Sequence, residues 1–383
     1  MIALLAGLST VIWIALLGFH GRFWQAGPVL RRVPKTSSAP AVSVVVPARD
    51  EAESIQSCLS SLLTQDYAGD YRIVLTDDRS EDGTGALARA LPDPSHRLTV
   101  IDGQVRPSGW SGKLWAVQQA VTRALADRPG DDGYILLTDA DIEHDPHHVV
   151  TLVEKAEREG LDMVSEMVEL NCVSVAEKAL VPAFVFFFAL LYPFARVADP
   201  KSRTAAAAGG TILIRRAALA RIGGIAALRG ALIDDCTLAA HVKRSGGRIY
   251  LGHSCLARSI RPYPHPSDIW RMIARTAYVQ LRYSPLMLVG TVLGMILVWI
   301  VPALVMLCGK GTARRLGAIA WTASMASYVP TLRRFQMSPL WAVLLPFVAM
   351  FYTAATIGSA VDHHRGRGVR WKNRAYTEAT HAG

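Results

Sequence analysis

Two aspartates follow an apolar run in the segment YILLTDADIEHDP, which spans residues 134–146. Asp139 and Asp141 leave the end of a predicted strand and face one site across a tight turn. Two carboxylates in this arrangement repel each other unless a cation lies between them. Mg²⁺ takes oxygen ligands, often one or two carboxylates together with substrate phosphates, and Mn²⁺ suits the same ligands. The segment predicts a divalent-metal site that could include Glu143 of the same turn, with a solvated turn as the alternative.

A second acidic segment, VSVVVPARDEAES, spans residues 42–54 and also begins as an apolar, β-branched run. Its acids, Asp50 and Glu51, follow directly after that run. They are either site carboxylates or first-turn acids that stabilise a helix N-terminus.

A third segment, TDDRSEDGT, spans residues 76–84. Asp77 and Asp78 stand at its strand end, where they could accept hydrogen bonds from a nucleobase N–H or from ribose hydroxyls. The residues expected to shape the following turn are Ser80, Asp82 and Gly83. A plain turn or helix entry is the alternative for this segment.

Four apolar runs must position these acids, and each is followed by a polar turn and a helix-like stretch. The runs are VSVVV (42–46), YRIVLT (71–76), LTVI (98–101) and YILLT (134–138). This alternation predicts an α/β fold, with a mostly parallel sheet and helices on both of its faces. Because ligands of open α/β sheets bind at the carboxyl ends of the strands, the acids are expected at the ligand site.

The charge pattern indicates a membrane protein. Of the 383 residues, 51% are hydrophobic and 19% are charged, and the net charge is +10. The excess bases flank apolar segments at 22–35, 309–315, 333–334 and 362–383, whereas the block 36–285 is nearly neutral. Since a nucleic-acid-binding protein concentrates its bases on the folded domain, no nucleic-acid partner is expected. Juxtamembrane bases explain the pattern.

The five cysteines are scattered and form no C-x-x-C pair, which argues against a disulfide framework or a zinc site. A reducing, cytoplasmic location of the polar block fits this usage.

The predicted organisation has five parts. They are a transmembrane helix at 1–21, a basic linker at 22–40, a cytoplasmic domain at 41–285, a C-terminal membrane region at 286–361 and a basic tail at 362–383. A cleaved signal peptide is the alternative for the first part. Bases after the first span place the domain in the cytoplasm and Met1 outside.

The C-terminal membrane region contains uncharged stretches at 286–308, 316–332 and 335–361. These predict two or three spans, because the middle stretch is short and could be re-entrant. Two further segments, 179–195 and 267–282, are predicted to lie at the membrane surface.

The order PARDEA, DD-x-S-x-DGT, GK-x-x-A, DAD and then an acidic pair resembles that of family 2 glycosyltransferases of the GT-A fold. The resemblance covers about residues 40–285. It implies a nucleotide-diphospho-sugar transferase domain, a nucleotide-sugar donor (a UDP-sugar by family default), inverting transfer and a Mg²⁺ or Mn²⁺ cofactor.

The resemblance also implies roles for individual residues. Around the nucleotide and its diphosphate it places Pro47, Ala48, Arg49, Glu51, Asp77 or Asp78, and Lys113. As metal ligands it places Asp139 and Asp141, with Glu143 where some lipid-directed members have a third. On the acceptor side it places Gly209 and Gly210.

The acidic pair Asp234-Asp235 matches the pair that carries the family's base. Asp235 would take the proton of the acceptor hydroxyl as that oxygen attacks the anomeric carbon. A role as N-cap of the following helix is compatible with this function.

Processive members of the family, which make polymers, carry Q-x-x-R-W. The corresponding segment here, Gln280-Leu-Arg282-Tyr283, is one residue shorter and lacks the tryptophan. This departure favours the transfer of one sugar per acceptor. Gln280 and Arg282 remain candidates for contact with the diphosphate.

The segment GWSGKLWA, the apolar segments and the tail GRGVRWKNRAY resemble lipid-directed members, in particular the hopene-associated glycosyltransferases of bacterial hopanoid gene clusters. Carotenoid and ceramide glycosyltransferases are more distant. This resemblance implies a multi-pass protein of the bacterial inner membrane with a lipid acceptor, a hopanoid. The alternatives are a processive polysaccharide synthase-like enzyme, a nucleotidyltransferase of similar fold and a non-enzymatic membrane scaffold that retains a GT-A domain.

Overall fold

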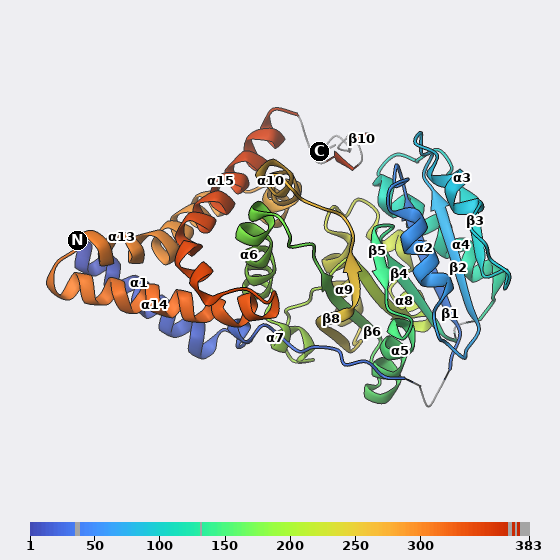
Figure 1. Cartoon of the computed structure of the whole chain (residues 1–383), viewed down its shortest axis with the longest axis horizontal. Coiled ribbons are helices and arrows are strands. Elements are labelled where there is room, and N and C mark those ends of the chain that lie inside the picture. The colour runs from blue at the N-terminus through green and yellow to red at the C-terminus, as the bar shows by residue number, and fades with distance from the viewer. Residues whose placement is uncertain (35–38, 131, 367–369, 372–373, 376–383) are drawn as a thin grey trace. The chain divides into compact units, whose positions relative to one another are not determined.

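The structure is a computed structural model that describes residues 1–34, 39–130, 132–366, 370–371 and 374–375 (Figure 1). The chain divides into two compact units, and each is described by itself. The first unit comprises residues 1–27, 172–195 and 262–369, and the second comprises 28–171, 196–261 and 370–383.

An eight-stranded sheet forms the centre of the second unit, in the order β3-β2-β1-β4-β7-β6-β8-β5. The strands are β1 (Val42–Ala48), β2 (Tyr71–Asp77), β3 (Leu98–Asp102), β4 (Tyr134–Thr138), β5 (Ile142–His144), β6 (Met163–Glu169), β7 (Thr211–Arg215) and β8 (Ile249–Ser259). The first four confirm the four predicted runs.

The sheet is mixed, with parallel pairs in the majority among the described strands. β1 pairs in parallel with β2 and β4, β2 with β3, and β6 with β8. β7 runs antiparallel to β4 and β6, and β5 runs antiparallel to β8. The predicted α/β fold is therefore confirmed, and the antiparallel strands lie on one side of β4.

Helices cover both faces of this sheet. They are α2 (Ile55–Leu63), α3 (Thr84–Arg89), α4 (Gly112–Asp127), α5 (His148–Glu159), α8 (Arg216–Arg221) and α9 (Asp234–Arg244). Val44 and Val46 share a core with Ile55 and Leu59 of α2, whereas the intervening Val45 is buried on the opposite face. Because α4 also packs on β1 and β2, all seven residues of β1 are buried.

The first unit is helical. Its helices are α1 (Ile2–Phe19), α6 (Val175–Leu191), α10 (Pro266–Ala274), α11 (Ala277–Gln280), α12 (Pro285–Met295), α13 (Val301–Cys308), α14 (Gly311–Arg334) and α15 (Leu345–His364). A π-helical segment, Ile296–Ile300, joins α12 to α13. The short helix α7 (Phe194–Ala198) contains the point where the chain passes into the second unit.

Three helical stretches are long and apolar enough to cross a membrane: Ile2–Phe19, Pro285–Cys308 and Pro339–His364. They indicate membrane association. The stretch predicted at 316–332 lies within α14, a continuous helix of 24 residues. Which side of the membrane each end occupies, and how many spans form, stay predictions.

Polar and aromatic contacts join these helices. The indole of Trp13 in α1 donates to the carbonyl oxygen of Val298 at 2.9 Å, and its ring centroid lies 4.8 Å from that of Trp299. Thr10 donates to the carbonyl oxygen of Leu316 in α14 at 3.1 Å. These contacts hold α1 against the C-terminal helices of its unit.

Residues 172–195 and 262–285, which the predicted domain 41–285 includes, group with the apolar helices in the first unit, and the predicted domain boundaries stay a prediction. Glu177, buried at the start of α6, accepts from the backbone N–H of Tyr263 at 2.7 Å. The hydroxyl of Tyr352 in α15 donates to the carbonyl oxygen of Leu180 at 2.8 Å. The predicted surface location of 179–195 and 267–282 stays a prediction.

The predicted basic tail, 362–383, lies largely outside the described residues. Within it, β9 (Arg370–Trp371) and β10 (Arg374–Ala375) pair antiparallel.

Candidate active site

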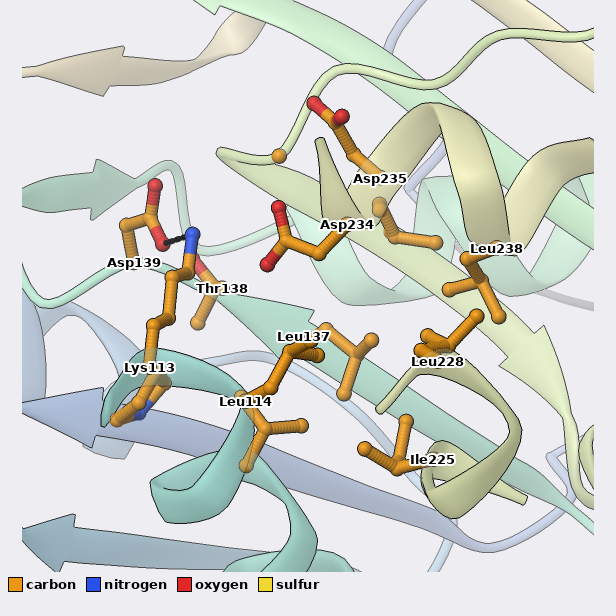
Figure 2. A pocket seen from close by; sticks show the side chains of 14 residues that line it. Lys113, Leu114, Leu137, Thr138, Asp139, Ile225, Leu228, Asp234, Asp235 and Leu238 are labelled. Carbon is orange, nitrogen blue, oxygen red and sulfur yellow. Dashed lines mark ion pairs between the residues drawn. The ribbon is translucent and has the colours of Figure 1, made fainter. Parts of the chain in front are cut away.

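An ion pair joins the end of β4 to the start of α4. β4 ends at Thr138, which places Asp139 at the carboxyl edge of the sheet. Ser111 caps α4 by accepting from the N–H of Leu114 at 3.1 Å, so Lys113 stands in the first turn. Its Nζ lies 2.6 Å from Oδ1 of Asp139 (Figure 2).

A small pocket of about 30 Å³ opens beside this pair, enough space for about two water molecules. Its polar side chains are those of Lys113, Thr138, Asp139, Asp234 and Asp235, and its other lining residues are Pro47, Leu114, Val117, Leu137, Gly209, Ile212, Ile225, Leu228 and Leu238 (Figure 2). The predicted base, the predicted diphosphate lysine and one predicted metal ligand therefore share one pocket.

Asp235 is an acid with an altered proton affinity. It lies in the first turn of α9, where its Oδ1 accepts from the N–H of Cys236 at 2.7 Å. Burial and the neighbouring charge of Asp234 raise the pKa of Asp235 to about 6. A carboxylate with a pKa near the working pH is suited to general base catalysis.

The pKa of Lys113 is determined by two opposing effects, burial and the charges of nearby acids. Burial lowers its pKa, but the carboxylates of Asp139 and Asp234 outweigh that effect, so the pKa is raised above its ordinary value. The ammonium group therefore stays charged at neutral pH and can face a phosphate.

Gly209 brings this cluster together. A Cβ atom at this position would lie 3.3 Å from Oδ2 of Asp235 and 3.7 Å from Nζ of Lys113. The neighbouring Gly210 accepts from the hydroxyl of Thr138 at 2.9 Å through its carbonyl oxygen. The predicted acceptor-side segment thus lies against the predicted base.

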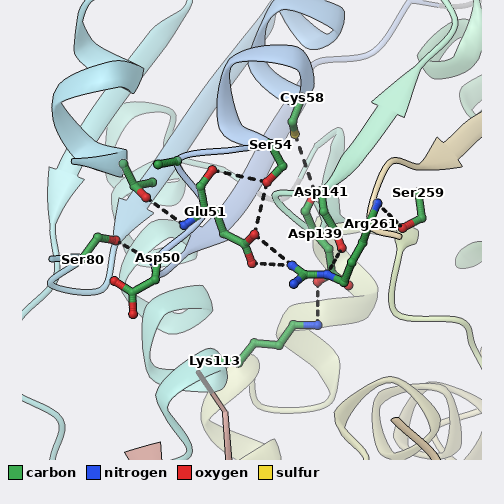
Figure 3. Close-up of polar contacts among 12 residues, drawn as sticks. Asp50, Glu51, Ser54, Cys58, Ser80, Lys113, Asp139, Asp141, Ser259 and Arg261 are labelled. Atoms are coloured by element: carbon green, nitrogen blue, oxygen red, sulfur yellow. Dashed lines mark hydrogen bonds and ion pairs between the residues drawn. The ribbon is translucent and has the colours of Figure 1, made fainter. Parts of the chain in front are cut away.

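Asp141 and Glu51 share one basic partner, Arg261 (Figure 3). Nε of Arg261 lies 2.6 Å from Oδ2 of Asp141. Its Nη2 lies 2.7 and 2.8 Å from the two carboxylate oxygens of Glu51. Arg261 was not among the predicted site residues, because it stands alone in a segment without a recognisable motif.

Each of the three predicted metal ligands has a basic partner in this structure. The pairs are Asp139 with Lys113, Asp141 with Arg261, and Glu143 with Arg258. Among the described residues, no group of three or more His, Cys, Asp or Glu side chains is arranged as a metal site. The metal-binding role of these acids stays a prediction.

The loops after β1 and β2 are hydrogen-bonded to each other. The N–H groups of Asp50 and Glu51 donate to the hydroxyls of Ser80 (3.0 Å) and Thr84 (2.8 Å). Oδ2 of Asp82 accepts from the N–H of Ala52 at 2.9 Å. The expectation that Ser80 and Asp82 shape this turn is confirmed.

Arg49, Asp77 and Asp78 lie at the same loops, and Arg49 and Asp77 form hydrogen bonds there. The buried guanidinium of Arg49 donates to the carbonyl oxygens of Asp78 (2.5 Å) and Arg79 (3.2 Å). The carboxylate of Asp77 accepts from the N–H of Ser80 at 3.0 Å, and the side chain of Asp78 is fully buried. Ala48 is buried too, so contact of these residues with a nucleotide stays a prediction.

Gln280 and Arg282 belong to the first unit. The side-chain amide of Gln280 donates to the hydroxyl of Tyr192 at 2.6 Å. Arg282 has a left-handed backbone, with φ at 52°. Their predicted role toward the diphosphate is not tested by these contacts.

Residues 9–381 match the family described as "Glycosyl transferase family 21". The chain belongs to glycosyl transferase family 21. The motifs had predicted a GT-A glycosyltransferase of family 2, so the enzyme class is confirmed and the family number is corrected to 21. None of the comparisons is specific to hopanoids.

Curated relatives match shorter stretches. Glycosyltransferase AglE of Haloferax volcanii is 31% identical over 97 residues, which are 25% of this chain and 32% of that protein. The 4,4'-diaponeurosporenoate glycosyltransferase of Staphylococcus aureus is 33% identical over 103 residues, which are 27% of this chain and 24% of that protein. The family 21 chain thus aligns with about a third or less of either protein.

A solved structure supports the fold over nearly the whole chain. The mannosyltransferase PcManGT from Pyrobaculum calidifontis, in complex with GDP-Man and Mn²⁺, superposes with a TM-score of 0.56 at 20% identity. The match covers 96% of this chain and 100% of that one. At this identity the likeness establishes the GT-A fold.

Proposed function

We propose that this family 21 glycosyltransferase moves one sugar from a nucleotide-sugar to the hydroxyl of a membrane lipid, with inversion at the anomeric carbon. The observation that carries the proposal is the pocket shared by Lys113, Asp139 and Asp235. It combines a lysine whose pKa is raised by neighbouring carboxylates with an aspartate whose pKa is about 6. Transfer from a sugar diphosphate needs both: a cation for the leaving group and a base for the acceptor.

The proposed step is a single displacement. The acceptor oxygen forms a bond to the anomeric carbon while the bond from that carbon to the diphosphate oxygen breaks. The hydroxyl proton passes to the carboxylate of Asp235, and the nucleoside diphosphate leaves with the electron pair. Lys113 stabilises the negative charge that builds on the leaving diphosphate. Attack from the face opposite the leaving group inverts the configuration.

The acids after β4 suit a hard divalent cation. Asp139 and Asp141 offer carboxylate oxygens from one strand end, and Mg²⁺ often uses one or two carboxylates together with substrate phosphates. These two residues would hold Mg²⁺ or Mn²⁺, with Glu143 as a third candidate. When bound, the ion supplies Lewis-acid stabilisation of the diphosphate. The relative with Mn²⁺ and GDP-Man in its structure supports this assignment.

A lipid acceptor is supported by the three long apolar helices of the first unit. A relative named for glycosylation of 4,4'-diaponeurosporenoate points to the same class. From the resemblance to hopene-associated enzymes we infer that the acceptor is a hopanoid alcohol. From the incomplete Q-x-x-R-W segment around Gln280 and Arg282 we infer that a single sugar is transferred. From the same resemblance to hopene-associated enzymes we infer a bacterial inner membrane location with the donor site on the cytoplasmic side.

The experiment uses the full chain in lipid nanodiscs. UDP-glucose, UDP-GlcNAc and GDP-mannose are each offered with Mn²⁺ and a hopanoid alcohol, and products are identified by mass spectrometry. We expect one hexose or N-acetylhexosamine per lipid and release of the nucleoside diphosphate. Products with a ladder of sugars would support the processive alternative. Release of pyrophosphate would support a nucleotidyltransferase. The absence of turnover with any of the three donors would support a scaffold.

The acceptor is tested separately in cells, by lipid mass spectrometry with and without the protein. Loss of a glycosylated hopanoid supports the proposed acceptor. Loss of another glycolipid would keep the transferase and replace its acceptor.

A further inference from the structure

Arg261 lies between two acids that reach it from different parts of the sheet. Its Nε contacts Asp141 after β4, and its Nη2 contacts both oxygens of Glu51 after β1 (Figure 3). The exposed fraction is 33% for the Arg261 side chain and 13% for each of the two acids. In this partly buried place one guanidinium is shared by two carboxylates and offsets one of their two negative charges.

The backbone fixes this arrangement. β5 pairs antiparallel with the end of β8, with Ile142 opposite Ser259. The N–H of Ile260 continues the pairing by donating to the carbonyl oxygen of Asp141 at 2.9 Å. Arg261 is the next residue, so its side chain starts beside Asp141. The sheet pairing therefore fixes the backbone position from which the Arg261 side chain reaches Asp141.

A divalent cation at the predicted metal site would need oxygens that now face basic groups. Oδ2 of Asp141 faces Arg261, and Oδ1 of Asp139 faces Lys113. A cation of charge +2 and a guanidinium repel each other strongly at such distances, because both lie where solvent screening is incomplete. Binding of the metal therefore competes with Arg261.

We propose that Arg261 acts as a built-in counter-cation that pairs with Asp141 and Glu51 in the metal-free protein. It weakens the binding of the metal when no nucleotide is bound. Metal binding is thereby coupled to the binding of the nucleoside diphosphate. This inference rests on the proposed function, since it takes the nucleoside diphosphate and the divalent ion as the two ligands. Arg261 acts on the metal through Asp141.

The coupling follows from charge. A nucleoside diphosphate adds negative charge beside the metal and offers a guanidinium a new anionic partner, because arginine binds phosphate bidentately. When Arg261 has that partner, Asp141 is released to the metal. Linkage requires that the effect be reciprocal: the diphosphate strengthens metal binding by the same factor as the metal strengthens diphosphate binding.

The test measures Mn²⁺ affinity of the full chain in nanodiscs, by titration calorimetry and by the electron spin resonance of free Mn²⁺, with and without UDP or GDP. In the wild-type protein we expect the nucleotide to tighten Mn²⁺ binding at least about 10-fold, within the usual range of coupling energies. In Arg261→Gln we expect Mn²⁺ alone to bind about 10-fold more tightly than in wild type, and the nucleotide effect to fall by about the same factor, so that only the coupling from direct contact of the ion with the diphosphate remains.

Two further variants separate this role from simple loss of charge or structure. Arg261→Lys keeps the charge and should retain part of the coupling. Arg221→Gln removes an arginine that pairs with Asp162 at 3.1 Å, outside the site, and should behave as wild type. If Arg261→Gln unfolds readily, thermal unfolding gives the readout: Mn²⁺ should raise its Tm more than it raises that of wild type.

Unchanged Mn²⁺ affinity and unchanged nucleotide coupling in Arg261→Gln would overturn the inference while sugar transfer by the wild type remains. Failure of the wild type to bind any nucleoside diphosphate would overturn the inference together with the proposed function. The two failures are therefore distinguishable.

Discussion

Gly209 and Asp235 approach so closely that a Cβ atom on Gly209 would lie 3.3 Å from a carboxylate oxygen of Asp235. Such a separation is tighter than ordinary contact, so a methyl group here would push the carboxylate aside. The same Cβ would reach Lys113 Nζ at 3.7 Å. The backbone of the acceptor-side segment thus forms one wall of the place where the proposed base works.

The first prediction concerns this wall. Gly209→Ala should lower the rate of sugar transfer about 10-fold, because a small displacement of a catalytic group is costly. Nucleotide-sugar affinity should change less, since the loops after β1 and β2 are not touched. The measurement is kcat and KM for transfer in nanodiscs. Gly290→Ala is the matched control, because its Cβ would meet no atom within 4 Å. A wild-type rate for Gly209→Ala would show that Asp235 has room to adjust.

The second prediction concerns the acids after β4. Asp139→Asn and Asp141→Asn should each abolish transfer and weaken nucleotide-sugar binding in Mn²⁺, because the proposed ion bridges the protein to the diphosphate. Titration calorimetry with and without Mn²⁺ measures the effect. Asp127→Asn is a control, since Asp127 pairs with Arg123 within α4. Metal-independent donor binding that survives both substitutions would mean that this turn has no metal role.

The fold was predictable as far as local patterns reach. β1 to β4 were predicted because apolar, β-branched runs alternate with polar turns, and the strand ends carry the acids. Lys113 was predicted from a motif, and Ser111 places it by capping α4. What the sequence could not show is the antiparallel pairing of β5 with β8, which joins residues more than a hundred positions apart. Arg261 owes its contact with Asp141 to that pairing.

The grouping of α6 with the apolar helices has no local signal in the sequence either. A 17-residue apolar helix could pack on a sheet, lie on a membrane or join a helical unit, and composition does not distinguish these cases. The side chain of Glu177 ties the start of α6 to Tyr263 within the first unit. Such a long-range hydrogen bond has no periodic signal in the sequence.

A buried histidine pair also escaped prediction. His144 and His148 face each other at 2.8 Å between their Nδ1 atoms, and Nε2 of His148 lies 2.7 Å from Oε2 of Glu166. The side chains of His148 and Glu166 are fully buried. In the sequence His144 stands among the acids after β4, and its partners His148 and Glu166 carry no motif that links them to it.

The third prediction follows from this pair. His148→Leu should destabilise the second unit by about 3–5 kcal/mol, because it leaves Glu166 buried without its basic partner. Chemical denaturation in detergent, followed by fluorescence, measures the loss. The double variant His148→Leu/Glu166→Leu should recover much of the stability, since it removes the unpaired charge. Equal stability of the single variant and wild type would show that Glu166 finds another partner.

The fourth prediction is the pH dependence of transfer. Only the ionised form of Asp235 can accept a proton, and burial with the charge of Asp234 raises its pKa to about 6. The value of kcat/KM should therefore rise from pH 5 to pH 7 and reach half of its plateau near pH 6. A profile that stays flat down to pH 4.5 would contradict the assignment, since no group would then titrate in the expected range.

The fifth prediction is the substitution of the base itself. Asp235→Asn keeps nearly the same shape but cannot take a proton, so transfer should slow by about 10²–10⁴-fold. Nucleotide-sugar affinity should stay near the wild-type value, in contrast to Asp139→Asn. Asp234→Asn should be milder, because this neighbour adjusts the pKa of Asp235 and does not receive the proton. Loss of donor binding as complete as in Asp139→Asn would move Asp235 to the donor side.

The same variant has a consequence for stability. Because the folded-state pKa of Asp235 lies above its ordinary value of 3.8, ionisation costs more in the folded than in the unfolded protein. The stability that the protonated acid contributes is fully present below pH 3.8 and is lost as the pH rises through 6. Asp235→Asn does not ionise, so its Tm should exceed that of wild type at pH 7.5, and the difference should shrink at pH 4. Slower transfer together with a higher Tm is expected where an active-site base lowers the stability of the fold. A lower Tm at pH 7.5 would indicate that the hydrogen bond from Cys236 N–H outweighs the cost of the buried charge.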